Sequence, residues 1–293
     1  MDYSEKTSAE LKEICKERKI KGVSGKNKLQ LVELIQRAET APESTDVAGA
    51  DVSPPMEVTG GATPEMLELC KIPESLNIEQ IKDYVYHYMT PRIPFYHDTD
   101  RAPFIEDEFS EYFIAKSSGG TVIGNGNCAM DVQTKDNEGI DVMCVVMNRK
   151  QSNEKSIIQN FSVSGVDLDT LFKNEKHEEA VKLYTEQYSK KLTNVKTDKK
   201  LTDLYILAFV STKQDVFLVC FKMNIDNIKH ISSGGFVNTA SAKNIIIQHF
   251  INTSYGNVKL YKSKKRIELR LLDNVLKSEH AVKIYTMPPK ATE

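Results

Sequence analysis

The N-terminal part of the chain carries apolar residues at helical spacing in two short blocks. Residues 7–10, Thr-Ser-Ala-Glu, have the spacing of a capping box, and Leu11 and Ile14 then begin an apolar stripe. A second stripe runs from Leu29 to Ile35. The pattern predicts a hairpin of two short helices, whose apolar faces must pack together because isolated helices of this length are marginal in water.

The apolar pattern stops at residues 41–64, which hold four Pro, three Gly and four acidic residues but no Lys or Arg. Such a segment cannot bury enough apolar surface to offset the entropy that it loses on ordering. We therefore predict a flexible linker at residues 41–64, which joins a helical module at residues 1–40 to a larger domain at residues 65–293.

The larger domain mixes helical and strand periods. Helices are predicted around Ile81 and over residues 104–116 and 152–161, and a buried strand hairpin over residues 204–210 and 216–221. The predicted fold class is therefore α+β, with a small N-terminal helix hairpin, a linker, and an α/β domain whose mixed sheet is flanked by helices.

A second hairpin is predicted from residues 127–134 and 138–148, two β-rich runs joined by a three-residue turn. Side chains alternate across a strand, so Asp131 and Asp141 are neighbours if their two faces coincide. Adjacent carboxylates on apolar strands repel each other unless a cation lies between them, and oxygen ligands suit Mg²⁺ or Mn²⁺. The alternative is that both are ordinary strand-end acids facing water.

Residues 8–38, SAELKEICKERKIKGVSGKNKLQLVELIQRA, resemble the SAP domain, a helix-extended loop-helix DNA-binding module. The Leu-Lys-Glu start, the Ser-Gly-Lys before the second helix and the Leu-Val-x-x-Ile close all match, whereas Lys19 stands where a typical member has Gly. The resemblance implies that DNA is the partner and that this module binds it.

The residues before the second helix fit that role chemically. Free backbone N–H groups and the positive dipole end at a helix N-terminus favour a phosphate, and ammonium groups add attraction. We expect weak, salt-sensitive binding to the DNA backbone. The alternative is a solvated basic face. The candidate DNA-binding residues here are Ser24, Gly25, Lys26, Lys28 and Lys21.

Residues 104–221 resemble the PD-(D/E)XK nuclease core, in which an Asp on one strand and an acid-x-Lys on the next bind metal and activate water. The resemblance implies hydrolysis of a DNA phosphodiester with Mg²⁺ or Mn²⁺ as cofactor. It also implies a functional Gln on the helix after the hairpin, for which Gln159 is the nearest match. The implied catalytic residues are Asp131, Asp141, Lys155 and Gln159, and the implied metal ligands are Asp131, Asp141, Glu108 and Glu111.

One position departs from this family pattern. The residue two after Asp141 is Met143, and a thioether cannot replace the lysine's charge. Either another cation takes that role, or catalysis is lost. Lys135, Lys150 and Lys155 are the candidates, and we favour Lys155 because a helix packed over the hairpin can project it toward the site.

Charge and composition narrow the function classes. The 293 residues carry a formal net charge of −2, so DNA affinity must come from local patches. Five scattered cysteines indicate a reduced protein without disulfides, and no apolar run is long enough to span a membrane. We expect an intracellular location, in the nucleus or at a viral DNA-replication site. Lys264, Lys265 and Arg266, beside Tyr261, are candidates for a further DNA-binding patch. The alternative is a solvated charged face.

Two functions follow as hypotheses. The first is a metal-dependent DNA endonuclease that a SAP-like module tethers to DNA. The second is a catalytically inactive, nuclease-fold protein that binds DNA as an adaptor in DNA organisation, replication or repair. A SUMO-ligase-like regulator is a third class, but no Cys/His zinc cluster follows the linker.

Overall fold

The computed structural model describes residues 63–99, 101–124, 128–147, 154–159, 168–238, 243–261 and 266–290, together with residues 7, 10 and 14. For residues 154–159, 168, 169, 237, 238, 243 and 266 it describes the backbone alone. The chain divides into two compact units, Met1–Gly60 and Gly61–Glu293.

The first unit contains the predicted capping box. The backbone N–H of Glu10 donates to Thr7 Oγ1 at 3.4 Å, and the N–H of Thr7 donates to Glu10 Oε2 at 2.7 Å. Glu10 and Ile14 are helical, which confirms a helix start here. The rest of the SAP-like hairpin, the linker up to residue 62 and the candidate residues Ser24, Gly25, Lys26, Lys28 and Lys21 lie outside the described residues.

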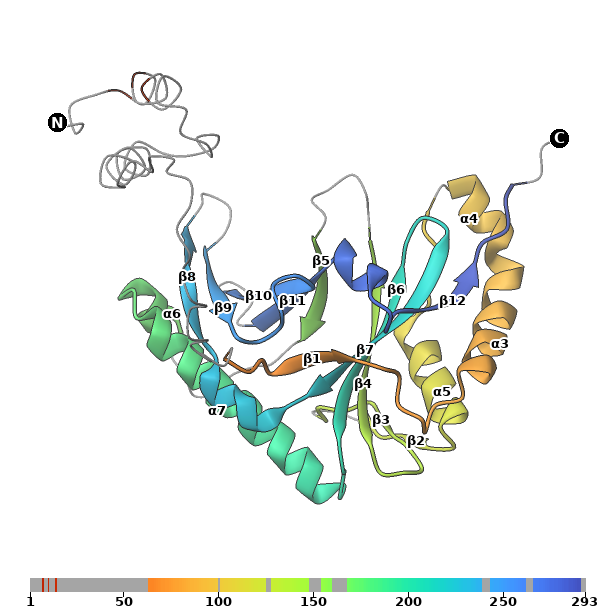
Figure 1. Ribbon diagram of the computed structural model, residues 1–293, viewed down its shortest axis with the longest axis horizontal. Coiled ribbons are helices and arrows are strands. Elements are labelled where there is room, and N and C mark those ends of the chain that lie inside the picture. Colours follow the sequence, from red (N-terminus) through yellow and green to blue (C-terminus); the bar gives the residue numbers. More distant parts are fainter. Residues whose placement is uncertain are drawn as a thin grey trace, which may run out of the picture. The chain divides into compact units, whose positions relative to one another are not determined.

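A mixed sheet forms the centre of the second unit (Figure 1). Its described strands run in the order β1-β7-β6-β4-β3-β2, and β12 pairs with the end of β7 that β1 leaves open. Strands β4 and β6 are parallel, and the other pairs are antiparallel. The bounds are β1 Leu67–Cys70, β2 Thr121–Val122, β3 Val132–Gln133, β4 Gly139–Val146, β6 Leu204–Ser211, β7 Asp215–Met223 and β12 Val282–Thr286.

Helices cover both faces of this sheet, as Figure 1 shows. One face carries α3 (Ile78–Met89), η1 (Thr90–Arg92), α4 (Ile93–Thr99) and α5 (Asp107–Ser117). The other face carries α7 (His177–Asp198), preceded by α6 (Leu168–Lys173). Side chains alternate between the two faces of a strand, so β4 contributes to both cores. Ile140 and Val142 pack with α3 and α5, whereas Met143 and Val145 pack with α7.

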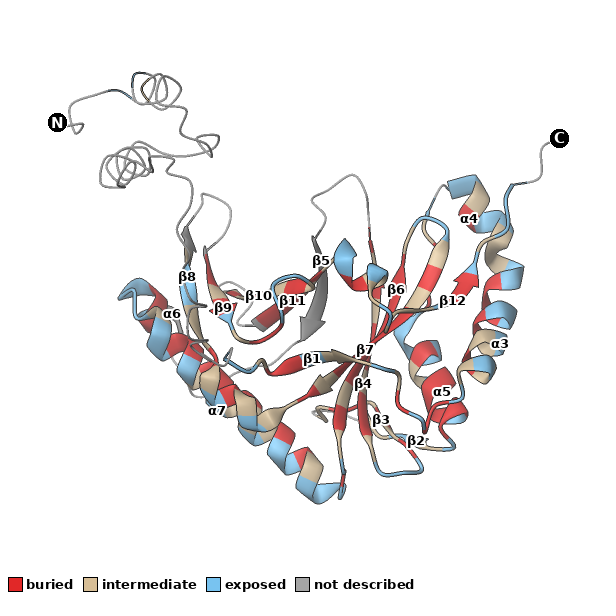
Figure 2. Cartoon of the chain, viewed as in Figure 1, coloured by how far each residue is buried: buried red, intermediate tan, exposed pale blue. Residues whose placement is uncertain are grey.

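A second, antiparallel sheet packs against α7 in the order β5-β11-β10-β9-β8. Tyr184 of α7 reaches into it, and its hydroxyl accepts a hydrogen bond from the backbone N–H of Ile267 at 3.2 Å. Figure 2 shows buried residues along the inner face of α7. The bounds are β5 Glu154–Gln159, β8 Ser232–Asn238, β9 Lys243–Gln248, β10 Gly256–Tyr261 and β11 Arg266–Leu272, with the short helices η2 Ile225–His230 and η3 Asp273–Lys277.

The α+β class, the mixed sheet and its flanking helices agree with the sequence prediction. The helix predicted over residues 152–161 is wrong, because Glu154–Gln159 is strand β5. Its Ile157 and Ile158 pair with Leu269 and Glu268 of β11. A short apolar run does not distinguish helix from strand, and the distant partner strand decided the outcome. Lys155 and Gln159 therefore lie on a strand of the second sheet.

Candidate functional site

The site is built on the hairpin of β3 and β4. Val132 pairs with Ile140 and Gln133 with Gly139, and the backbone N–H of Asp131 donates to the carbonyl of Ile140 at 2.9 Å. Asp131 and Val132 thus both face Ile140, as in a β-bulge, and the side chain of Asp131 reaches that of Asp141, the next residue of β4. The hairpin that the sequence predicts is therefore present, and its two aspartates are neighbours.

Asp131 caps the edge of β4 beyond the end of its pairing with β3. Because β3 begins only at Val132, which pairs with Ile140, the N–H of Val142 has no strand partner on that side and donates to Asp131 Oδ2 at 2.8 Å. The side chain of Asp131 also forms a hydrogen bond with Asp141. Two carboxylates this close repel each other unless a proton or a cation lies between them. Burial raises the pKa of Asp131, against the lowering effect of these two hydrogen bonds.

Helix α5 adds further carboxylates. The pKa of Glu111 is raised to about 7, first by burial and then by the charges of Asp131, Asp107 and Glu108. Asp107, in the first turn of α5, also raises the pKa of Asp131. We call Asp107, Glu111, Asp131 and Asp141 the carboxylate cluster. Asp107 was missed by the sequence reasoning, although its i, i+4 spacing from Glu111 places the two on one helix face.

Cys144 fixes how α5 lies on β4. Burial raises the pKa of its thiol to about 12, and its side chain forms hydrogen bonds with Ser110 and Asp107. Helix α5 therefore lies over the part of β4 that holds Cys144, two residues beyond Val142, whose N–H Asp131 caps. The cluster therefore straddles β4: Asp107 and Glu111 lie on the α5 side and Asp141 on the α7 side, and Asp131 at the strand edge interacts with all three.

Met143, at the position of the family's lysine, is buried in the core against α7 and is only 9% exposed. Asp141 lies on the same face of β4, where its charge and, above all, burial raise the pKa of Tyr188 on α7. The side chain of Lys135 lies against Gly119, at the hairpin turn. Lys150 and the side chains of Lys155 and Gln159 lie outside the described residues.

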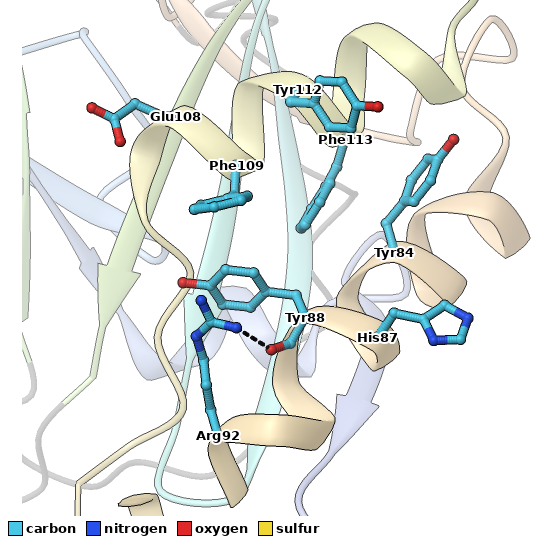
Figure 3. Close-up of a pocket in the computed structure, with 8 residues that line it drawn as sticks. All are labelled: Tyr84, His87, Tyr88, Arg92, Glu108, Phe109, Tyr112 and Phe113. Carbon is cyan, nitrogen blue, oxygen red and sulfur yellow. Dashed lines mark hydrogen bonds between the residues drawn. The ribbon is translucent and has the colours of Figure 1, made fainter.

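Glu108 occupies a different place from the cluster. It lines a pocket of about 620 Å³ between α3 and α5, where it lies apart from the aromatic rings (Figure 3). Its charge still acts on Glu111. In the part of the chain that the structure describes, no group of three or more His, Cys, Asp or Glu side chains is arranged so that it could hold a metal ion.

The C-terminal basic patch is described only in part. Lys264 and Lys265 lie outside the described residues, and Arg266 is described by its backbone alone. The hydroxyl of Tyr261 accepts a hydrogen bond from Arg270, which also forms an ion pair with Glu268 at 3.1 Å. Tyr261 is thus held within the second sheet's own polar contacts.

Comparisons with known proteins found no match: no family model, curated protein or solved structure is similar to this chain. A search of the described helices found none with the length and apolar character needed to cross a bilayer.

Proposed function

We propose that the chain is a DNA-binding protein that hydrolyses DNA phosphodiesters with Mg²⁺ or Mn²⁺ at the carboxylate cluster. The observation that carries this proposal is the pairing of Asp131 with Asp141 at the edge of β4. Such a pair is costly without a proton or a cation between the two groups, and functional sites are where such costs are found.

The donor atoms fit these metals. Mg²⁺ is commonly held by one or two carboxylates, with waters and substrate phosphates completing its shell, so a full protein cage is unnecessary. Asp131 and Asp141 would hold the ion, with Glu111 as a charged neighbour of Asp131. When bound, the metal would polarise the phosphate and lower the pKa of water.

The chain's own residues supply the rest of the chemistry. Glu111, with a pKa of about 7, can take up or release a proton near neutral pH, which is what a general base or acid requires. The N–H of Val142 fixes the orientation of Asp131. Helices α5 and α7 cover opposite faces of the hairpin's sheet and hold its strands in place.

The N-terminal module belongs to the same proposal. A SAP-like hairpin on a flexible link would turn the second DNA contact into an intramolecular one, at an effective concentration on the order of millimolar. A role in the nucleus or at a site of viral DNA replication follows from the same resemblance and remains a prediction.

Cleavage assays test the enzymatic proposal. We expect plasmid, linear or branched DNA to be cut in low salt with Mg²⁺ or Mn²⁺, and Asp141→Ala to reduce the rate at least about 100-fold, as loss of a metal ligand should. Asp136→Ala is the matched control, because Asp136 is an exposed aspartate in the turn of the same hairpin. Intact DNA under all these conditions would remove the enzymatic proposal.

One observation favours the inactive alternative. Met143 is part of the core where the resembled family has its lysine, so no side chain at that position adds positive charge to the site. In that case the chain would bind DNA as an adaptor. Asp141→Ala would then leave DNA affinity unchanged, and the wild-type chain would cut none of the three DNA forms.

A further inference from the structure

Aromatic side chains line most of the pocket between α3 and α5. Tyr88 and Phe113 are buried at its floor, while Phe109 and Tyr112 are 40% and 48% exposed at its rim. Tyr88 and Phe109 lie with ring centroids 5.0 Å apart, and Tyr84 stacks on Phe113 at 5.5 Å. Figure 3 shows these rings facing a shared space from both helices.

Arg92 gives the pocket a fixed positive group. Its guanidinium carbon lies 3.8 Å from the centroid of the Tyr88 ring, and its Nη1 donates to the carbonyl of Tyr88 at 2.7 Å. Both contacts orient the guanidinium beside the rings, as Figure 3 shows. Its remaining N–H groups are donors of the kind that bind phosphate and base oxygens.

The lining indicates a planar, polar-edged ligand. Its eight residues are six ring side chains, one arginine and one glutamate, with no Leu, Ile, Val or Met among them: Tyr84, His87, Tyr88, Arg92, Glu108, Phe109, Tyr112 and Phe113. Grooves that receive amphipathic helices offer an aliphatic or Met-rich surface instead. Ring faces with an arginine are the platform on which proteins stack unpaired nucleobases.

The pocket and the carboxylate cluster share helix α5. Glu108, Phe109 and Tyr112 line the pocket, whereas Asp107 and Glu111, adjacent to them in sequence, belong to the cluster. Neighbouring residues on a helix point about 100° apart, so the two sites lie on adjoining faces of one element. A DNA strand with its phosphate at the cluster can therefore bring a nearby base to the pocket.

We propose that this aromatic pocket binds an unpaired nucleobase, so that the preferred substrate contains single-stranded or branched DNA. A base inside a duplex is already stacked and cannot enter without the cost of unstacking. The position of the strand rests on the proposed nuclease function, but binding of the base by the pocket does not.

Fluorescence of a 2-aminopurine base tests the pocket. A single-stranded pentanucleotide with one central 2-aminopurine is titrated with the full chain in EDTA, so that no metal-dependent cleavage occurs. We expect quenching by the wild-type chain, and binding weakened about 5- to 100-fold by Tyr112→Ala, the range for loss of one stacking partner. Tyr112→Phe keeps the ring and should bind as the wild type does.

Tyr86→Ala is the matched control, because Tyr86 is also an exposed tyrosine, at 58%, but does not line the pocket. The proposal is overturned if Tyr112→Ala binds the pentanucleotide as tightly as Tyr86→Ala does. It is also overturned if the quenching is as strong with a blunt duplex that carries the same base. Uptake of an apolar dye that depends on Tyr112, without quenching by DNA, would indicate a protein-docking groove instead.

The two proposals fail separately. If the chain cuts DNA with Mg²⁺ but Tyr112→Ala leaves the pentanucleotide affinity unchanged, the nuclease function stands and the base pocket is wrong. If Tyr112→Ala loses the quenching but no DNA is ever cut, the base pocket stands and the nuclease function is wrong.

Discussion

At the scale of single residues, Glu111 links the candidate site to the pH of the solution. Its pKa rises from the ordinary 4.5 to about 7 in the folded chain, mainly through burial. Between these two values the folded state binds a proton that the unfolded state has released. The free energy of unfolding should therefore fall as the pH rises from 4.5 through about 7.

Chemical denaturation without divalent ions at several pH values between 4 and 8 measures this effect. Glu111→Gln removes the titration and should flatten the curve, although Asp131 contributes in the same direction because burial raises its pKa too. Glu108→Gln is a suitable control, since its charge is the smallest cause of the Glu111 shift. A Glu111→Gln curve as steep as that of the wild type would contradict the shifted pKa.

Part of the site could be read from the sequence. The hairpin that brings Asp131 near Asp141 followed from two β-runs and a short turn, because such strand pairing is local. The irregular pairing of Asp131 with Ile140 was not visible in the sequence. Asp107 and the aromatic pocket depend on how α3 and α5 pack on the sheet. Nothing in the spacing of Tyr88 and Phe109 reveals that the two rings meet.

At the scale of elements, the shortness of β3 gives Asp131 a structural task. Its carboxylate replaces the missing strand as the acceptor for the N–H of Val142. Asp131→Ala leaves that buried N–H without its acceptor and should lower the free energy of unfolding by about 1–3 kcal/mol. Asp131→Asn keeps an acceptor oxygen and removes only the charge. It should therefore lower the free energy of unfolding by clearly less than Asp131→Ala does.

Urea unfolding of the two variants measures the difference. If both variants lower the free energy of unfolding equally, the hydrogen bond from Val142 to Asp131 does not stabilise β4. Both variants remove the charge of a proposed ligand, so both should weaken metal binding. Stability and metal binding together therefore distinguish the structural role of Asp131 from its proposed role as a ligand.

Element types were predictable where the partner is close in sequence. The β6–β7 hairpin and α3 followed from local pattern, and Asn77 caps α3 by accepting from the N–H of Gln80 at 3.1 Å. Strand β5 was not predictable, because its partner β11 lies more than a hundred residues further along the chain. The expected role of Lys155 rested on that wrong helix.

At the scale of the whole molecule, DNA affinity is expected to come from the N-terminal unit. The chain's net charge of −2 offers no general attraction to a polyanion. Lys26→Ala with Lys28→Ala should weaken binding of a long duplex and reduce the slope of log K against log salt by about 0.9 per lost phosphate contact. Fluorescence anisotropy at several salt concentrations measures this slope, and an unchanged slope would contradict a DNA-binding role for these lysines.

The central claim is that Asp131 and Asp141 hold a divalent cation between them. Mn²⁺ binding to the full chain, followed by electron paramagnetic resonance across pH 5–8, tests it most directly. We predict a bound ion whose affinity rises with pH, because Asp131, whose pKa burial raises, and its neighbour Glu111, with a pKa of about 7, must lose their protons. The ion should be lost in Asp141→Asn and retained in Asp136→Asn. Binding that is equal in these two variants, or no binding at any pH, would contradict the claim.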